Sequence, residues 1–222
     1  MNPPLRPPPP ARAGSRLAIY LALAGTALAC TRHEPLSDLG TLPDWRFTDQ
    51  TGAAVGSATL AGRPWAANFL FTSCPSSCPL LAAATARLQA KVRAWSPAGE
   101  PEAVQLVSIS VDPQTDTVAR LATFAAKYGA DARLWRLATG PYEAMERLVT
   151  EGFMLPILRA DLAVGSSADE QRAGRERPTP LDTAHSLRFV LVDAEGHMRG
   201  LYGQDDAELG RLDAALRQLA GR

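Results

Sequence analysis

From residue 65 onward the chain alternates between two kinds of hydrophobic pattern. Residues 65–71 form a short apolar run, which is typical of a buried strand, and residues 79–95 then repeat apolar positions at helical spacing. The same two patterns return over 103–111, an apolar and β-branched run, and over 117–129, an amphipathic segment closed by glycine. The pattern therefore predicts strand, helix, strand and helix in succession.

The elements on either side of this repeat are shorter or more polar. Residues 44–64 alternate around glycine turns, which predicts a hairpin, and residues 158–180 form a long polar loop. The remaining patterns predict a short strand at 132–139, a helix at 140–152, two strands joined by a turn at 185–203, and a helix at 205–221. This order predicts a single α/β domain of thioredoxin-like architecture, with a mixed central sheet flanked by helices.

Composition and charge narrow the class of protein further. The 222 residues are 46% hydrophobic and 21% charged, which is the composition of an ordinary globular protein of one domain. The 23 basic and 23 acidic side chains balance, and the sequence has no basic stripe with interleaved aromatic residues. We therefore expect no nucleic-acid partner.

The N-terminal region is predicted to lie outside the folded domain. Residues 17–29 are apolar but too few to span a bilayer, which takes about 20 residues, so 1–29 is predicted to be a signal peptide or N-terminal anchor. Small residues precede Cys30, as at a bacterial lipoprotein processing site, and Cys30 is therefore the predicted site of lipidation. Residues 30–43 then form a polar tether, and the domain occupies 44–222. We expect an exported, periplasm-facing protein held at the membrane.

Cysteine usage supplies the candidate chemistry. Cys74 and Cys78 have three residues between them and lie where the first strand gives way to the first helix. If the helix includes the pair, both sulfurs lie on one side of its first turn, where backbone N–H groups and the helix dipole favour thiolate. Three uses of the pair remain open. A structural disulfide would close a short loop and so give little stabilisation, and a redox pair of the thioredoxin type normally has two intervening residues. Capture of Cu(I) needs a third ligand besides the two thiolates.

The chain has three histidines that can supply such a ligand. His33 lies in the tether and His197 in the predicted hairpin turn, and a solvated role is expected for both. His185 differs, since it ends the polar loop and directly precedes a strand, and loops presented by a rigid scaffold commonly carry function. From the pattern alone, His185 is equally compatible with a metal ligand and with a capped or buried histidine.

Three ordered motifs resemble those of the SCO/SenC family of thioredoxin-like copper proteins. Residues 74–79, CPSSCP, are similar to the CxxxCP motif of that family. Residues 110–117, SVDPQTDT, are similar to its VDPxxDT segment, and residues 185–193, HSLRFVLVD, to its histidine followed by a strand that ends in aspartate. The resemblance extends over residues 44–220 and therefore covers essentially the whole predicted domain.

The resemblance implies a copper metallochaperone. By it, Cys74, Cys78 and His185 bind copper, Cu(I) first and Cu(II) in some members, and thiolate and imidazole suit Cu(I). The implied partner is the CuA-bearing subunit of cytochrome c oxidase, whose copper centre is assembled or kept reduced, with a thiol reductant or other copper chaperones as further partners. The two cysteines are also expected to cycle as a redox-active pair, because a disulfide cannot ligate Cu(I).

Two aspartates of the VDPxxDT segment have alternative roles. Asp112 follows the second strand, where it either tunes the copper site or starts a turn with Pro113. Asp116 is expected to cap the helix that begins there, as Thr117 also can.

Departures from the family pattern leave other functions open. Ser76 and Ser77 stand between the cysteines, where many relatives carry an acidic residue, so the affinity for the cation is expected to differ. The arginine-bearing loop 158–180 would let the imidazole of His185 swing away and release the metal. The alternative functions are a thiol-disulfide reductase acting on exported protein thiols, a thiol peroxidase and a copper sensor.

Overall fold

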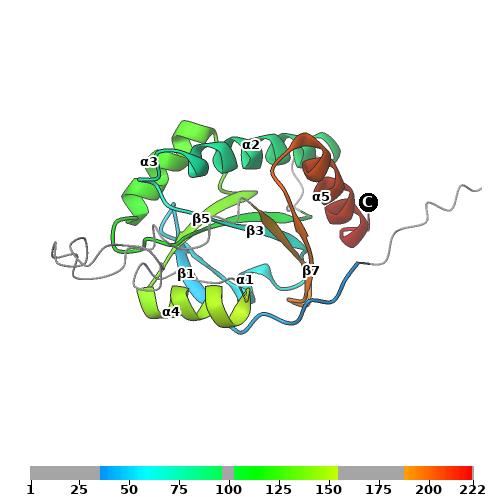
Figure 1. Ribbon diagram of the computed structural model, residues 1–222, viewed down its shortest axis with the longest axis horizontal. Coiled ribbons are helices and arrows are strands. Elements are labelled where there is room, and N and C mark those ends of the chain that lie inside the picture. The colour runs from blue at the N-terminus through cyan, green and yellow to red at the C-terminus, as the bar shows by residue number, and fades with distance from the viewer. Residues whose placement is uncertain (1–35, 97–102, 155–187, 222) are drawn as a thin grey trace, which may run out of the picture. The chain divides into compact units, whose positions relative to one another are not determined.

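A seven-stranded sheet forms the centre of the fold in the computed structural model, which describes residues 36–96, 103–154 and 188–221 (Figure 1). Its strands are β1 (Arg46–Asp49), β2 (Ala54–Gly56), β3 (Trp65–Leu70), β4 (Gln105–Ser110), β5 (Trp135–Thr139), β6 (Phe189–Val192) and β7 (Met198–Tyr202). They are ordered β2-β1-β5-β4-β3-β6-β7. The central strands β5, β4 and β3 are parallel, whereas β1, β6 and β7 pair in antiparallel fashion with their neighbours. The predicted mixed sheet is confirmed.

Helices cover both faces of this sheet. They are α1 (Ser57–Leu60), α2 (Ser77–Trp95), α3 (Val118–Tyr128), α4 (Tyr142–Arg147), which continues as the π-helix η1 (Leu148–Gly152), and α5 (Asp206–Leu219). In Figure 1, α2, α3 and α5 lie over one face, and α1 and α4 lie over the other. Helix α2 contacts both α3 and α5. The predicted thioredoxin-like arrangement of a sheet flanked by helices is therefore confirmed.

Burial explains why the central strands were visible in the sequence. Every residue of β3 and of β4 is buried, as expected for parallel strands that are covered on both faces. Helix α2 turns its apolar stripe toward them, with Leu81, Leu88 and Val92 buried. The carboxyl ends of β3 and β4 thus lie side by side in the middle of the sheet.

Two helical features differ from the expected pattern. The short helix α1 was not predicted, because one turn is too short to show a helical period; it begins where Gly56 N–H donates to Thr59 Oγ1 at 2.9 Å. The predicted helix over 140–152 changes from α4 to the π-helix η1 along its length, a distinction that hydrophobic spacing does not make.

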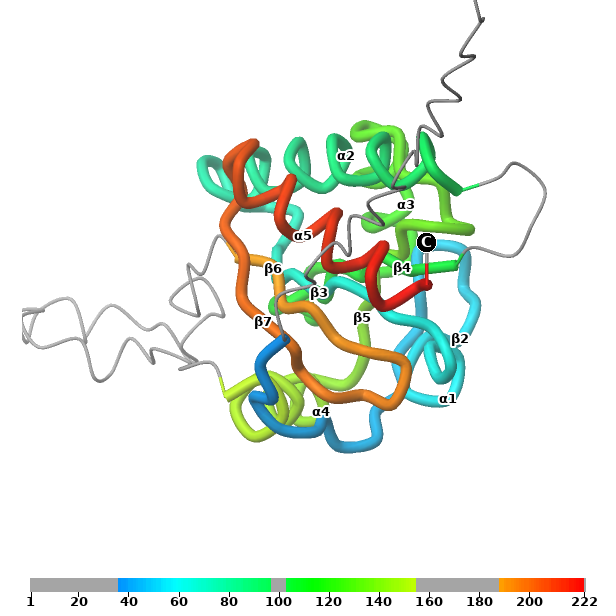
Figure 2. The backbone as a smooth tube through the Cα atoms, turned by 90° about the vertical axis from the view of Figure 1, so that its right-hand side faces the viewer, coloured from blue at the N-terminus to red at the C-terminus, as the bar shows by residue number. Residues whose placement is uncertain are grey.

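The residues that lead into the domain pair with the sheet before Asp44, where we expected the domain to begin. Leu39 N–H donates to Met198 O at 2.9 Å, and Met198 N–H donates to Gly40 O at 2.8 Å. Figure 2 shows this blue segment beside β7. Residues 1–35 and 155–187, which hold the predicted signal segment and the polar loop, lie outside the described residues.

No helix within the described ranges is both long enough and apolar enough to cross a bilayer.

Candidate metal centre

The two cysteines follow β3 and lie at the start of α2. The chain turns at Thr72 and Ser73, and Cys74 N–H closes this turn by donating to Phe71 O at 3.3 Å. Helix α2 begins at Ser77, so Cys78 belongs to its first turn while Cys74 precedes it. The condition under which we expected the sulfurs to converge, a helix that includes both residues, is therefore met for Cys78 alone.

The sulfur of Cys74 nevertheless lies at the start of α2, because the Cys74 side chain folds back over the helix end. Cys78 N–H donates to Cys74 Sγ at 3.3 Å, and Ser77 Oγ lies 3.3 Å from the same sulfur. Cys74 Sγ thus takes the place of a capping side chain on the first-turn amides of α2. Phe71 N–H contacts Cys78 Sγ at 3.5 Å. Both residues are free thiols, with exposed fractions of 7% for Cys74 and 5% for Cys78.

The two thiols differ sharply in acidity. Burial raises the pKa of the Cys74 thiol, but the hydrogen bonds from Ser77 and from the backbone of Cys78 and Ser76 together outweigh it and lower the pKa to about 6. Burial raises the pKa of the Cys78 thiol to about 12, and the neighbouring Cys74 adds to the increase. The helix-end argument predicted thiolate for both, so it holds for Cys74 and is wrong for Cys78, where burial dominates.

A third donor is not supplied by the described part of the chain. Among these residues, no group of three or more His, Cys, Asp and Glu side chains is arranged to hold a metal ion. His197, the one histidine in the described ranges, precedes β7, and its Nδ1 lies 3.3 Å from Thr41 Oγ1. The predicted ligand His185 and the predicted lipidation site Cys30 lie outside the described residues, so both stay predictions.

Asp112 serves its own turn. It is half-buried; its Oδ1 accepts a hydrogen bond from Thr115 N–H at 3.3 Å, and its own N–H donates to Ser110 Oγ at 3.1 Å. These hydrogen bonds hold the turn that Asp112 starts with Pro113, which was the alternative role that we predicted for Asp112. A role for its carboxylate in tuning a copper site stays a prediction.

Asp116 is the residue of this site that sequence reasoning missed. The expectation that it caps α3 is wrong, because Thr117 is the cap and accepts from Arg120 N–H at 3.3 Å. Asp116 is instead completely buried and binds the cysteine loop, accepting from Thr72 Oγ1 at 2.5 Å. It also accepts from Ser110 Oγ at 2.7 Å. The sequence did hold a signal for this role: Thr72 follows β3, Ser110 ends β4 and Asp116 lies in the loop after β4, and β3 and β4 are neighbouring parallel strands.

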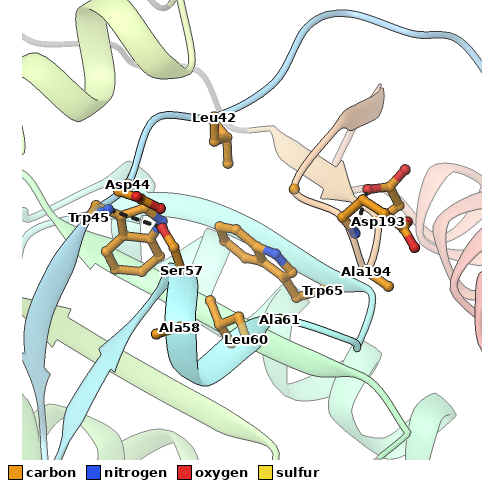
Figure 3. A pocket seen from close by; sticks show the side chains of 12 residues that line it. Leu42, Asp44, Trp45, Ser57, Ala58, Leu60, Ala61, Trp65, Asp193 and Ala194 are labelled. Carbon is orange, nitrogen blue, oxygen red and sulfur yellow. Dashed lines mark hydrogen bonds between the residues drawn. The ribbon is translucent and has the colours of Figure 1, made fainter.

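A cavity of about 280 Å³ lies at the other end of the sheet. Trp65, the first residue of β3, lines it together with Trp45 and the turn that begins at Asp193 (Figure 3). Because the cysteines follow the last residue of β3, this cavity is separated from them by the length of the strand. It forms no part of the thiol site.

Comparison with known proteins identifies close relatives in sequence. A family model described as SCO1/SenC matches residues 35–221. The SCO1 protein homolog of Bacillus subtilis (strain 168) is 37% identical over 150 residues, which cover 68% of this chain and 67% of that protein. The family model thus matches almost all of the described residues, and it is the family that the sequence motifs led us to expect.

Solved structures show the same relationship. A SCO1/SenC family lipoprotein from Bacillus anthracis str. Ames has a TM-score of 0.65 and 26% identity, covering 84% of this chain and 99% of that chain. BsSco, a member of the Sco family of cytochrome c oxidase assembly proteins with an identified disulfide switch, has a TM-score of 0.65 and 23% identity over 84% and 98%. ScoI of Bradyrhizobium japonicum with copper bound has a TM-score of 0.60 and 18% identity over 81% and 99%.

BsSco and ScoI are less than 25% identical to this chain, so their similarity shows a shared fold only. The family model matches residues 35–221, which include the cysteine pair, and the Bacillus subtilis relative and the Bacillus anthracis structure belong to the same family. This chain belongs to the SCO1/SenC family.

Proposed function

We propose that this chain is a copper metallochaperone that binds copper through Cys74, Cys78 and His185. Its role is the assembly or maintenance of the CuA site of cytochrome c oxidase. The observation that carries the proposal is that two buried thiols lie together at the start of α2, where Cys78 N–H donates to Cys74 Sγ at 3.3 Å. Two soft sulfur donors suit Cu(I), and a relative of the same fold has been solved with copper bound.

The acidity of the two thiols sets the chemistry of loading. Cys74, with a pKa of about 6, is thiolate at neutral pH and is ready to bind the cargo. Cys78, with a pKa of about 12, still carries its proton. Binding of Cu(I) between two thiolates therefore releases about one proton per chain at pH 7, and that proton comes from Cys78.

The redox state of the pair gates this binding. A Cys74–Cys78 disulfide offers no thiolate, so it must first take up two electrons and, at neutral pH, about one proton, which stays on Cys78. A thiol reductant supplies both and leaves as its own disulfide. The related BsSco, for which a disulfide switch has been identified, is consistent with such gating.

Anaerobic titration with Cu(I) against a chromophoric chelator tests the proposal. We expect one copper per wild-type chain, none in the Cys74→Ser, Cys78→Ser double variant, and an affinity at least about 10-fold lower in His185→Ala. His197→Ala is the matched control, because this histidine lies near Thr41 beside β7, and it should leave the affinity unchanged. Full copper binding by the double cysteine variant would overturn the proposal.

A second candidate, a thiol-disulfide reductase acting on exported protein thiols, is favoured by the same acidity difference. In such an enzyme Cys74, whose thiol pKa is low, would be the nucleophile, and the buried Cys78, whose thiol pKa is high, would be the resolving cysteine. Reduction of insulin by the metal-free reduced protein separates the two functions. A reductase loses activity in Cys74→Ser and keeps it in His185→Ala, whereas a metallochaperone shows little turnover in either.

The membrane attachment that we propose rests on Cys30 and the apolar segment before it. Lipidation at Cys30 would hold the domain at the periplasmic face of the membrane, and a related family member is described as a lipoprotein. Phase partition in Triton X-114 checks this. The full chain should enter the detergent phase, and Cys30→Ala should shift it to the aqueous phase if Cys30 carries the lipid.

A further inference from the structure

Two loops that begin side by side build the cysteine site. Strands β3 and β4 are parallel, and their pairing continues one step further, where Val111 N–H donates to Leu70 O at 2.9 Å. The loop after β3 carries Thr72 and Cys74, and the loop after β4 carries Asp116. A bond between these loops therefore ties the cysteine segment to a fixed part of the sheet.

Asp116 makes that bond with both of its carboxyl oxygens. Its Oδ2 accepts from Thr72 N–H at 3.0 Å and from Ser110 Oγ at 2.7 Å. Its Oδ1 accepts from Thr72 Oγ1 at 2.5 Å and is 3.2 Å from Thr72 N. The side chain is fully buried, so losing these donors would leave a desolvated carboxyl without compensation.

Thr72 transmits this restraint to the first sulfur. Its backbone N–H and its hydroxyl are both held by Asp116, which fixes the residue at the start of the turn. Cys74 lies two residues later and closes the turn through its N–H to Phe71 O. With the turn in this position, Cys74 Sγ lies 3.3 Å from both Ser77 Oγ and the backbone nitrogen of Cys78.

We propose that Asp116 is the positioning residue of the thiol pair: by holding Thr72, it sets the sulfur of Cys74 over the first turn of α2. The proposal rests on the proposed copper function for the use of the site, but the geometry and its test involve no metal. The hydrogen bonds of Asp116 in the described structure go to Thr72 and Ser110, not to a sulfur, so Asp116 acts through Thr72.

Asp116→Asn keeps the size of the side chain but replaces one acceptor oxygen with a donor. The reduced pair, which depends on the held turn, should then lose stability relative to the disulfide. We expect the equilibrium constant for reduction to fall about 10-fold, which corresponds to a potential about 30 mV more negative. The Asp116–Thr72 hydrogen bonds support the loop that carries Cys74, so their loss should also lower the Cu(I) affinity by about 10-fold.

The experiment equilibrates metal-free protein with glutathione buffers, in which each protein disulfide is reduced as two glutathione thiols become one glutathione disulfide. Thr72→Val, which removes only the hydroxyl, should shift the potential in the same direction as Asp116→Asn but less. Thr72→Ser, which keeps the hydroxyl, should match the wild type. Asp193→Asn is the matched control, because Asp193 is another buried carboxylate that holds a turn, at the far end of the sheet.

The outcomes separate positioning from general support of the fold. A shift in Asp116→Asn and Thr72→Val, with none in Asp193→Asn, supports the proposal. A lower melting temperature with an unchanged potential in Asp116→Asn overturns it, and so does an equal shift in Asp193→Asn. If Asp116→Asn does not fold, Thr72→Val decides alone. A wild type that binds no copper but shows these shifts would refute the copper function and leave the positioning role intact.

Discussion

Each end of the sheet buries a carboxylate under a turn, and the two carboxylates are held in different ways. At the far end, Asp193 accepts from His197 N–H at 2.8 Å and from Arg199 Nε at 2.6 Å. At the cysteine end, Asp116 takes its hydrogen bonds from Thr72 and Ser110, both uncharged. The exposed fractions are similarly low, 4% for Asp193 and 0% for Asp116.

The difference lies in what each carboxylate connects. The partners of Asp193 lie within six residues of it, so it shapes its own hairpin turn, and its hydrogen bond raises the pKa of the Arg199 guanidinium. Thr72 is 44 residues from Asp116, so that bond joins two loops brought together by the parallel strands β3 and β4. The hydrogen bonds of Asp193 are thus local, whereas those that hold the cysteine loop depend on tertiary structure.

The largest expected effect is on stability, at the far end. Trp65 is 3% exposed and packs against Trp45 and Phe153. Trp65→Ala should lower the free energy of unfolding by about 3–5 kcal/mol, measured by urea denaturation. The alkylation rate of Cys74 in the folded variant should match the wild type. A changed rate would show that the two ends are coupled.

Asp193→Asn should have the next largest effect. The new amide group meets Arg199 with a donor instead of an acceptor, so the free energy of unfolding should fall by about 1.5–3 kcal/mol. Urea denaturation measures this loss. Cys74 alkylation in the same protein is the control, and a loss well under 1 kcal/mol would mean that the arginine bond contributes little.

The third prediction concerns pH at the cysteine end. Because the pKa of Cys74 is lowered from 9.0 to about 6, the rate of its alkylation by iodoacetamide in metal-free reduced protein should rise about 10-fold from pH 5 to pH 7 and then level off. Cys78, with a pKa raised to about 12, should stay unreactive over this range. A midpoint near pH 9 for Cys74 would contradict the helix-end geometry.

The same shift affects stability with a definite sign. A lowered thiol pKa stabilises the folded, reduced protein; this contribution is complete above pH 9 and is lost as the pH falls through 6. Comparison of wild type with Cys74→Ser by urea denaturation isolates it, and the wild-type advantage should grow from pH 6 to pH 8.

The smallest effect is expected for Leu80, an apolar residue of the cysteine end that is 59% exposed. Leu80→Gln removes little buried surface, so the free energy of unfolding should change by no more than about 0.5 kcal/mol in the same urea assay. A loss of 2 kcal/mol or more would show that this side chain is buried in solution.

Sequence patterns predicted the fold where burial is continuous. Strands β3 and β4 were visible as apolar runs because both faces of the sheet are covered, and α3 was visible through its amphipathic spacing and its closing Gly129, which has a φ of 66°. The four-residue α1 lacked the length for a helical period. Periodicity therefore predicts elements that pack along their whole length and misses single turns.

The site was less predictable, because local and tertiary roles share the same residues. In the pair Asp116-Thr117 either side chain suits a helix cap, and the choice depends on Thr72, which lies close only in the folded chain. The helix-end rule predicted thiolate for both cysteines, but Cys74 lies before α2 and is acidic, whereas Cys78 lies in its first turn and burial raises the pKa of its thiol. Spacing identified the thiols, and only the three-dimensional packing distinguishes them.

The pairing of residues 39–42 with β7 has a consequence for self-association. An edge strand with open backbone groups is a template on which other chains add strands and aggregate. Here Leu39, Gly40 and Leu42 form backbone hydrogen bonds with Met198 and Gly196. The chain's own leading segment therefore occupies the backbone groups at the start of the β7 edge, so another chain cannot add a strand there.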